Sequence, residues 1–435
     1  MDMIEIIEKK KRGQSLSEEE INFFVEGYTK GTIPDYQMSA LLMAIFFKEM
    51  NRDETFFLTK AMQYSGDIID LSLIKGVKVD KHSTGGVGDK TTLIVGPLAA
   101  ACGVPIAKMS GRGLGFTGGT VDKMESIPGF RTTLKEKEFI ALVNKIGLSI
   151  IGQTSHVAPA DKKIYALRDV TATVDQPSLI ASSIMSKKLA SGSDAMVLDV
   201  KCGNGAFMKN MEDAVALGQT LVSIGKSAGK RTIVAITDMN QPLGMEVGNS
   251  NEVIEAIETL KGKGPEDITE LSLSLAGMMI FVGEKASSFE EGKLKAKAVL
   301  ASGEALKKLR DFIEGQGGNP KVVEDYSLFP TPTHFKEVKG SAKDGFVTVI
   351  SAERIGLASQ HSGAGRATKD DEIDLSAGIS LKKKVGDPYK EGEILAVVFG
   401  QDLEKVERGA KEIEKAFTIG KRQTQPEELI KKIIS

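Results

Sequence analysis

The stretch Val77-Lys-Val-Asp-Lys-His-Ser-Thr-Gly-Gly-Val-Gly-Asp-Lys-Thr-Thr92 decides the fold of this chain. Its first four residues alternate apolar and charged side chains, which predicts a β-strand. A loop with three glycines follows, and the apolar residues after it predict a helix over 89–102. A strand, a glycine-rich turn and a helix in this order indicate a mainly parallel α/β sheet. Such sheets bind their ligands beyond the carboxyl ends of the strands.

The loop itself carries groups that bind an oxyanion. Lys81 offers a cation, Ser83 offers a hydroxyl, and the glycines let backbone N–H groups approach closely. His82 is one of only four histidines, and its place in the loop makes it the natural proton donor or polarising group. Asp89 stands where a Walker A loop needs a glycine, so that class of nucleotide-binding loop is disfavoured. A plain strand-to-helix turn is the structural alternative.

A second glycine loop follows the next predicted strand, 104–109, and spans Lys108 to Glu125. Ser110 and Thr120 can add hydroxyl donors for the same anion, and Thr120 also suits the N-cap of a helix that begins near Val121. One phosphate shared by two strand ends explains both loops, whereas a purely structural account predicts neither.

Working outward, helical periodicity dominates the first 65 residues, and Ser17 with Glu20 forms a capping box before one of these helices. We predict a small all-helical domain built from 1–65 and 160–193. A large α/β domain with a mainly parallel sheet takes 77–154 and 194–330, and a C-terminal α+β portion takes 331–435. Chain crossings near 66–76 and 154–159 would serve as hinges between the first two parts.

A third group of polar residues lies on the returning helices. Ser183 and Lys187 are four residues apart and share one helix face, and Arg168 ends the preceding helix. These side chains are mainly hydrogen-bond donors, which suits a ligand edge rich in acceptors. A solvated lysine face is the alternative interpretation, since Lys187 and Lys188 are adjacent.

Composition excludes several function classes. The 435 residues carry 57 Lys+Arg and 59 Asp+Glu, and the net charge of −2 disfavours nucleic-acid or membrane-surface binding. The two cysteines form no disulfide framework, the N-terminus is no signal peptide, and the longest apolar stretch is broken by Gly and Pro, so we expect a cytoplasmic protein. No His, Cys, Asp and Glu cluster has zinc spacing. A turn at 386–395 is similar to that of lipoyl-type barrels but lacks an attachment lysine, so we interpret it as structural.

The second loop resembles the signature of the thymidine and pyrimidine-nucleoside phosphorylase family. The matching residues are Ser110-Gly-Arg-Gly-Leu114, Thr117-Gly-Gly-Thr120, Asp122 and Glu125. The first loop, 81–89, is similar to the family's first loop, and Asp238-Met-Asn-Gln-Pro-Leu-Gly244 and Gly363-Ala-Gly-Arg366 match later segments. The resemblance covers essentially the whole chain.

The resemblance implies reversible phosphorolysis of uridine, thymidine and deoxyuridine to free base and (2-deoxy)-α-D-ribose 1-phosphate, in nucleoside salvage and catabolism. It implies three catalytic residues, His82, Arg168 and Lys187, of which Arg168 and Lys187 hold the pyrimidine with Ser183. It further implies that inorganic phosphate is the co-substrate and is bound by Lys81, Ser83, Thr92, Lys108, Ser110 and Thr120. Lysine at position 108 goes with the branch of the family that accepts uridine as well as thymidine.

The resemblance also implies a monovalent cation, K⁺, bound between Gly88, Lys90, Leu243, Glu246 and Glu255. This chain departs from the family pattern at Lys90, often threonine, and at Glu246, often alanine. Phe116 replaces a histidine of many relatives, which puts in doubt any need for a second histidine. We expect a homodimer, because residues 38–47 are more apolar than a small helical unit needs.

Two other functions stay open on the sequence alone. A phosphoribosyltransferase of the anthranilate type would use a similar fold and a glycine loop for phosphates, and would need a magnesium-pyrophosphate site. A non-catalytic nucleoside-binding protein would tolerate replacement of His82. Consumption of inorganic phosphate rather than phosphoribosyl pyrophosphate separates the two enzymes.

Overall fold

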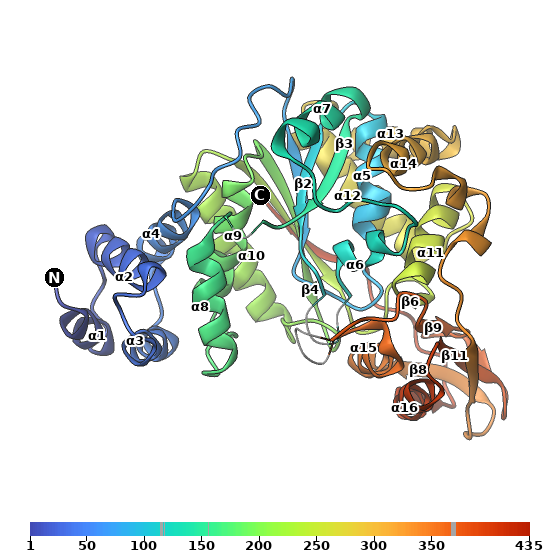
Figure 1. Ribbon diagram of the computed structural model, residues 1–435. Coiled ribbons are helices and arrows are strands. Elements are labelled where there is room, and N and C mark those ends of the chain that lie inside the picture. The colour runs from blue at the N-terminus through green and yellow to red at the C-terminus, as the bar shows by residue number, and fades with distance from the viewer. Residues whose placement is uncertain (114–115, 117, 155, 367–370) are drawn as a thin grey trace.

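The computed structural model describes residues 1–113, 116, 118–154, 156–366 and 371–435 (Figure 1). Two signature residues, Leu114 and Thr117, lie outside the described residues. The chain begins with four short helices, and side chains cap the starts of the first, second and fourth of them. Ser17 accepts a hydrogen bond from the Glu20 N–H at 3.3 Å and donates its own N–H to the Glu20 carboxylate at 2.7 Å, which confirms the predicted capping box.

Helices from two distant stretches form one helical unit. Buried residues of the first 62 positions share a core with Ala160, Ile164 and Leu179 of the returning segment. The unit lies to one side of the molecule (Figure 1). Its helices are α1 (Met3–Lys11), α2 (Glu18–Lys30), α3 (Asp35–Lys48), α4 (Arg52–Gln63), α8 (Pro159–Asp169) and α9 (Pro177–Ala190). Helix α9 also packs on the central sheet through Met185 and Leu189, so it belongs to both parts.

The central sheet has the order β1-β4-β5-β13. Strands β1 (Val79–Ser83), β4 (Ala195–Cys202) and β5 (Arg231–Asp238) are parallel. Strands β2 (Ile106–Ser110) and β3 (Leu148–Gly152) form a second parallel pair. A backbone hydrogen bond of 3.1 Å from Val79 to Pro105 joins that pair to β1. The parallel alternation predicted from the sequence is confirmed.

Helices cover the sheet, and the most buried of them is α5 (Thr91–Ala101), which follows the first glycine loop. The others are α6 (Thr120–Glu125), α7 (Glu136–Ile146), α10 (Met211–Ser227), α11 (Ser250–Leu260), α12 (Glu266–Val282), α13 (Phe289–Ala301) and α14 (Glu304–Gly315). Apolar side chains of α5, α11 and α12 share one core cluster with the C-terminal portion.

The C-terminal portion consists of two small antiparallel sheets and two helices, α15 (Ala352–Ser359) and α16 (Leu403–Ile413). Its strands are β7 (His334–Lys339), β8 (Gly345–Ile350), β9 (Gly378–Leu381), β10 (Pro388–Tyr389), β11 (Ile394–Gly400) and β12 (Phe417–Gly420). The short strand β6 (Glu246–Gly248), which follows β5, pairs with β9 and ties this portion to the α/β domain.

One predicted boundary needs correction. The C-terminal portion was expected to keep all of 331–435, but β13 (Ile430–Ile434) adds to the central sheet, antiparallel to β5. The strand caps the free edge of β5, which would otherwise expose unpaired backbone groups. The other exact domain limits stay a prediction.

The helical unit and the α/β domain are joined by three connections, one more than predicted. At the first two, Asp67 donates its N–H to the His156 carbonyl at 2.8 Å, and a Cβ on Gly66 would lie 2.1 Å from that same oxygen. The third is at Gly192, whose φ of +83° only glycine adopts readily, and a Cβ there would lie 2.3 Å from the Ile69 carbonyl. The connections therefore touch one another and lie together.

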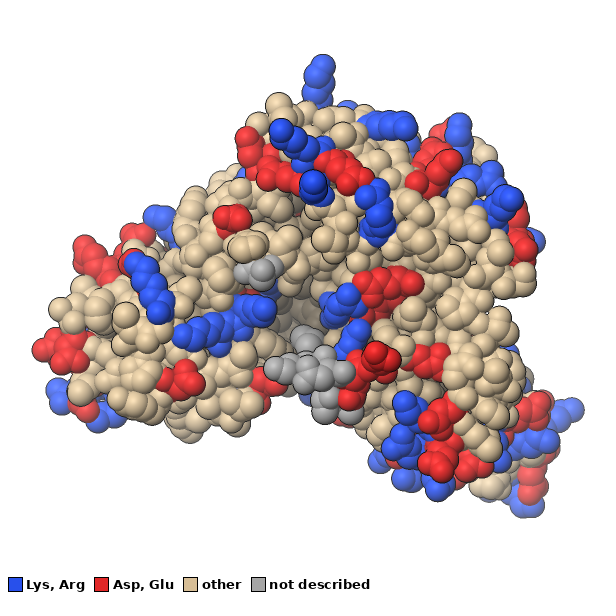
Figure 2. All heavy atoms as spheres, in the orientation of Figure 1, with Lys and Arg blue, Asp and Glu red and all other residues tan. Residues whose placement is uncertain are grey.

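The surface in Figure 2 is hollowed between the helical unit and the rest of the molecule, and acidic and basic side chains are interspersed over this face. Among the described residues, no helix has the length and apolar character needed to cross a bilayer. The fold is a small helical unit, a larger α/β domain with a mostly parallel sheet, and a C-terminal α+β portion, as predicted.

Candidate active site

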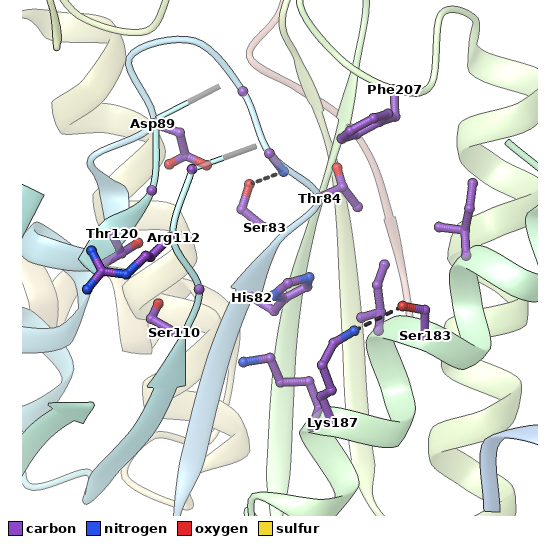
Figure 3. A pocket seen from close by; sticks show the side chains of 18 of the residues that line it. His82, Ser83, Thr84, Asp89, Ser110, Arg112, Thr120, Ser183, Lys187 and Phe207 are labelled. Atoms are coloured by element: carbon purple, nitrogen blue, oxygen red, sulfur yellow. Dashed lines mark hydrogen bonds between the residues drawn. The ribbon is translucent and has the colours of Figure 1, made fainter. Parts of the chain in front are cut away.

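One cavity of about 320 Å³ lies where the helical unit meets the carboxyl ends of β1 and β2. Figure 3 shows the strand-end loops on one side of it, helix α9 on the other, and His82 between them. Apart from Lys81, every residue predicted to bind phosphate or pyrimidine lines this cavity: His82, Ser83, Thr92, Lys108, Ser110, Thr120, Arg168, Ser183 and Lys187.

The α/β side of the cavity is built from hydroxyls and glycine backbone. Ser83 and Thr92 flank the first loop, and Ser110 and Thr120 flank the second. The Gly85 N–H donates to the Ser83 hydroxyl at 3.2 Å. Thr120 is the first residue of α6 and not its N-cap, since Gly119 takes that position and no side chain caps the helix. The Thr120 hydroxyl is therefore not engaged in helix capping.

Lys81 lies beneath the first loop and not on the cavity wall. Its buried ammonium donates to the Thr91 hydroxyl at 2.5 Å and lies 3.5 Å from Asp199 and 3.8 Å from Asp89. Asp199 in turn pairs with the buried Lys201 at 2.8 Å. Burial disfavours charge on Asp89, but Lys81 and Lys201 outweigh it and hold the pKa of its carboxyl well below the usual range. This buried charge network fixes the loop from below.

A second set of buried charges supports β2. Asp80 lies 3.3 Å from the Lys108 ammonium and 2.9 Å from that of Lys188, which also donates to the Met109 carbonyl at 2.9 Å. Lys108 additionally donates to the Lys81 carbonyl. Burial, together with the charges of Lys188 and Lys81, lowers the pKa of Lys108 to about 7. Lys108 therefore changes charge near neutral pH.

His82 is half-buried at the centre of the cavity. Burial and the charges of four lysines, Lys188, Lys108, Lys187 and Lys81, lower the pKa of its imidazole well below the usual value. The ring is therefore neutral at physiological pH, with one N–H donor and one acceptor. It can polarise a ligand oxygen by a hydrogen bond but does not carry a resident positive charge.

Arg168 is held at the end of α8 by backbone carbonyls. Its guanidinium donates to Thr173 at 3.1 Å, to Leu179 at 3.1 Å and to Val174. A guanidinium has five N–H donors, so donors remain for a ligand in the cavity that Arg168 lines. Burial lowers the pKa of this group to about 10, which leaves it charged at neutral pH.

Ser183 and Lys187 meet on one face of α9, as their spacing predicts. The Lys187 ammonium donates to the Ser183 hydroxyl at 2.9 Å (Figure 3), and also to the buried Asp161 carboxylate of α8. The pair with Asp161 fixes the direction of the lysine, and its side chain keeps 23% of its surface exposed toward the cavity.

The signature loop is held by ion pairs that sequence reasoning did not assign. Arg112 contacts both Glu125 oxygens, at 2.6 and 2.7 Å, and Asp122 at 2.9 Å. Asp122 also accepts the Gly113 N–H at 2.7 Å and an ion pair of 3.0 Å from Arg366. The acidic residues of the signature thus fix its backbone, and Arg366 links the loop to the C-terminal portion.

Several further residues line the cavity without having been predicted, among them Tyr165, Phe207 and Lys188. Phe207 is 52% exposed, unusual for such an apolar ring, and this exposure at a cavity is the signal that marks it. Phe116, by contrast, is not among the lining residues. A Cβ on Gly356 would lie 2.7 Å from its ring, so Phe116 packs against α15.

The five residues predicted to bind K⁺ come together, but they do not fit a free ion. The ammonium of Lys90 donates to the Leu243 carbonyl at 3.2 Å, to the Glu246 carbonyl at 2.7 Å and to the Glu255 carboxylate. The Gly88 carbonyl accepts the backbone N–H of Lys90 itself at 2.9 Å. The oxygens that would hold the ion are thus already engaged. Elsewhere in the described residues, no three His, Cys, Asp or Glu side chains form a metal-binding group.

Three family models match the chain. They are the helical bundle domain of a glycosyl transferase family over residues 4–66, the a/b domain of that family over 75–306, and the pyrimidine nucleoside phosphorylase C-terminal domain over 346–420. The solved anthranilate phosphoribosyltransferase of Thermus thermophilus is 19% identical, with a TM-score of 0.58, and covers 72% of this chain and 99% of its own. That likeness shows the shared fold. Fold and cavity together define a glycosyltransferase of the pentosyl-transferring class.

The names of the curated relatives are more specific than those of the family models. The pyrimidine-nucleoside phosphorylase of Staphylococcus haemolyticus is 55% identical over 100% of both chains. That of Geobacillus stearothermophilus is 56% identical over 92% of each. The chain belongs to the pyrimidine-nucleoside phosphorylase family, which confirms the resemblance seen in the sequence.

Proposed function

We propose that this protein catalyses the reversible phosphorolysis of pyrimidine nucleosides, including uridine, thymidine and deoxyuridine. The products are the free base and (2-deoxy)-α-D-ribose 1-phosphate, in nucleoside salvage and catabolism. The observation that carries this proposal is the cavity between the strand ends and α9. It has an anion-binding side of hydroxyls and glycine loops, and a facing side with the donors of α8 and α9.

Phosphate binds to the α/β side. Ser83, Thr92, Ser110 and Thr120 offer hydroxyl donors, and Lys108 offers a cation in its protonated form. Lys81 acts from below, through the loop that it fixes. Phosphate held by both loops is directed at the anomeric carbon of the sugar. Holding the two reactants in this geometry removes most of the entropic barrier to a bimolecular attack.

The pyrimidine binds to the helical side. The C–N bond breaks through an oxocarbenium-like state, so negative charge develops on the departing base. Arg168, Lys187 and Ser183 present donors to its oxygens. Because these donors are fixed in advance by backbone carbonyls and by Asp161, they stabilise the developing charge without reorganisation.

His82 lies between the two sides as a neutral imidazole. Its N–H polarises the pyrimidine oxygen nearest the bond that breaks. A neutral donor is suited to this task, because it gains most as charge develops on the base and contributes little to binding the uncharged nucleoside.

The two halves of the site lie on different parts of the chain, which are joined by three connections and by the packing of α9 on the central sheet. We therefore expect the helical unit to close on the α/β domain when both substrates are bound. A disulfide or chemical crosslink that locks the open form should abolish turnover. Full activity in the locked protein would refute closure.

The proposal is tested by an absorbance assay of uridine, thymidine and cytidine, each with and without phosphate. Uridine and thymidine should both be cleaved, since Lys108 goes with the broad branch of the family, and only when phosphate is present. Cleavage that needs no phosphate, or no cleavage of either nucleoside, would overturn it. Parallel reactions with phosphoribosyl pyrophosphate and a free base test the phosphoribosyltransferase alternative.

Two finer expectations accompany the proposal, and one earlier expectation is left out of it. A homodimer through α1–α4 is supported by the exposed apolar rings of Tyr36 and Phe47 on α3, which are 74% and 73% exposed, and light scattering would test it. A cytoplasmic location suits the free thiols of Cys102 and Cys202. We leave K⁺ out of the proposal, because the Lys90 ammonium takes the contacts that the ion would need.

A further inference from the structure

Lys90 is a lysine whose ammonium is entirely inside the protein. It precedes the first turn of α5, and its side chain has no exposed surface. An ammonium has three N–H donors, and here each has one oxygen acceptor: the carbonyls of Leu243 and Glu246 and the carboxylate of Glu255. The group is therefore fully satisfied without water.

The ammonium organises the segment between β5 and β6. Glu255 accepts the N–H of Met245 at 2.8 Å and that of Glu246 at 3.2 Å, so its carboxylate binds the same segment that Lys90 binds. A Cβ on Gly244 would lie 3.0 Å from the Lys90 nitrogen. The segment thus folds closely around the Lys90 ammonium, and a second cation, Lys384, donates to its Pro242 and Gly244 carbonyls.

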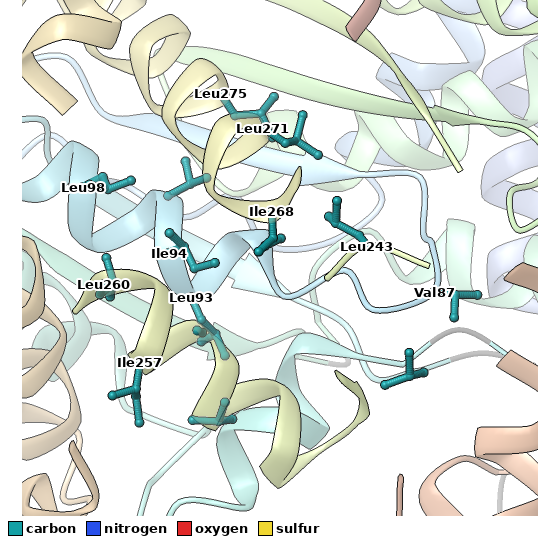
Figure 4. Packing of buried hydrophobic residues seen from close by; sticks show 14 of the residues in the cluster. Val87, Leu93, Ile94, Leu98, Leu243, Ile257, Leu260, Ile268, Leu271 and Leu275 are labelled. Atoms are coloured by element: carbon teal, nitrogen blue, oxygen red, sulfur yellow. The ribbon is translucent and has the colours of Figure 1, made fainter. Parts of the chain in front are cut away.

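This segment in turn supports the phosphate loop. The Leu243 N–H donates to the Val87 carbonyl at 3.0 Å, and a Cβ on Gly88 would lie 2.3 Å from the Leu243 oxygen. The side chains of Val87 and Leu243 both join the core cluster around α5 (Figure 4). Next to Lys90 in sequence, Asp89 and Thr92 line the cavity. The ammonium therefore lies directly behind the wall that receives the anion.

The surroundings are rich in negative charge. Glu255, Glu252 and Glu246 all act on Lys90; burial disfavours its charge, but these carboxylates prevail and raise the pKa of the ammonium. One further cation, Lys123, pairs with Glu252 at 3.3 Å. Glu246 itself is bound by Asn251 at 2.9 Å and Ser380 at 2.7 Å. Without Lys90, three carboxylates would face one lysine.

We propose that the Lys90 ammonium is a tethered monovalent cation. It replaces the diffusible K⁺ that the family resemblance implies, and it is a positioning residue for the phosphate loop. This assignment rests on the proposed phosphorolysis only for its effect on catalysis. Its structural part, that the site is already filled and binds no alkali cation, holds for any function of the cavity.

The first experiment uses the unmodified protein. Its thermal unfolding midpoint and its phosphorolysis rate are measured in KCl and in choline chloride at equal ionic strength. A ligand that binds only the folded state raises the midpoint with its concentration. We expect no K⁺-specific rise in either quantity. A saturable stabilisation or activation by K⁺ would overturn the proposal, whether or not any variant folds.

The second experiment compares Lys90→Thr with Lys90→Met, which fills similar space without charge. In choline chloride, both should show a lower midpoint and a loss of roughly 10- to 100-fold in kcat/KM for phosphate, because the loop is displaced, while the KM for uridine changes little. K⁺ should restore Lys90→Thr, whose emptied site regains oxygen ligands and excess negative charge. K⁺ should not restore Lys90→Met.

The outcomes separate the proposals. If Lys90→Thr matches the unmodified protein in choline chloride, or if K⁺ restores both variants equally, the tethered cation is refuted. If neither the unmodified protein nor either variant cleaves a nucleoside, the proposed function fails. The K⁺ dependence of the unfolding midpoint still decides the role of Lys90.

Discussion

The two sides of the cavity are built on different plans. The α/β side presents short hydroxyls and glycine backbone, and its charged groups, Lys81 and Asp89 among them, are engaged in ion pairs beneath or within the loop. The helical side presents long cationic side chains, and each of these is already held by an internal partner. The donors of the α/β side are placed by the ends of strands, whereas the donors of the helical side are placed by the contacts of individual side chains.

This difference suits the two ligands proposed for the two sides, phosphate and the pyrimidine base. A small anion needs several donors around it at once, which backbone and hydroxyls at the ends of adjacent strands provide. A flat, neutral base needs a few directed donors and gains its strongest contact only when it departs. Losing one hydroxyl should therefore weaken phosphate binding in part, whereas losing one cation of the helical side should remove stabilisation specific to the transition state.

The largest effect is expected for Lys187→Ala. Because the ammonium acts on charge that develops on the base, kcat/KM for uridine should fall roughly 10²–10³-fold, as for loss of one oxyanion donor. Phosphate affinity, measured by calorimetry, should stay close to that of the unmodified protein. Lys162→Ala, at an exposed position of the neighbouring helix α8, is the matched control and should be fully active. A large loss of phosphate affinity in Lys187→Ala would contradict the division of the cavity into two sides.

Ser110→Ala should have a smaller effect than Lys187→Ala, and the effect should fall on phosphate binding instead of on the nucleoside. A hydrogen bond to a charged group contributes about 1.5–3 kcal/mol, so the KM for phosphate should rise roughly tenfold or more, with the KM for uridine almost unchanged. Steady-state kinetics with each substrate varied in turn measures both. Equal effects on the two constants would show that Ser110 does not act on phosphate.

A smaller effect is expected from pH. The pKa of Lys108 is lowered to about 7, so the side chain is charged below this value and neutral above it. Its attraction for phosphate should therefore decline as the pH rises through about 7. Lys108→Met should lack this component and keep only the titration of phosphate itself. The measurement is the ratio of kcat/KM for phosphate in the two proteins across the pH range. A ratio independent of pH would show that the charge of Lys108 does not contribute to phosphate binding.

The smallest effect concerns the outer helices, far from both sides. Ser17→Ala removes the capping box of α2 and should cost about 1 kcal/mol of folding free energy, seen as a lower denaturation midpoint. Turnover should be unchanged, because α2 contributes no residue to the cavity. A change in kcat would show that the outer helices influence the helical side of the site more than the contacts suggest.

Much of this arrangement could be predicted because it is local. The capping box, the alternation of strands and helices, and the shared face of Ser183 and Lys187 depend on residues a few positions apart. The two glycine loops come together because parallel strands end at the same edge of a sheet, which is a general property of the fold.

What could not be predicted depends on partners distant in the chain. Lys81 is predicted from the sequence to bind phosphate, but its ion pair with Asp199 depends on the placement of β4 beside β1, which local spacing does not show. Lys90 is predicted from the sequence as part of the K⁺ site, but the direction of its side chain, which places its ammonium against Leu243, Glu246 and Glu255, depends on residues more than 150 positions away. Thr120 was expected to cap α6, but the chain turns one residue earlier, at Gly119. Neither strand order nor side-chain direction is encoded in local spacing.

The shared core of the helical unit has a consequence for how the molecule folds. The core of α1–α4 is shared with Ala160, Ile164 and Leu179, and the first three strands of the α/β domain with their helices lie between these two stretches of chain. Contacts between such distant residues carry a loop-closure cost and slow folding. The first four helices alone would leave an apolar surface exposed to solvent. The first four helices should therefore pack fully only once the intervening part of the α/β domain has folded. The helical unit and the α/β domain should then unfold as one cooperative unit.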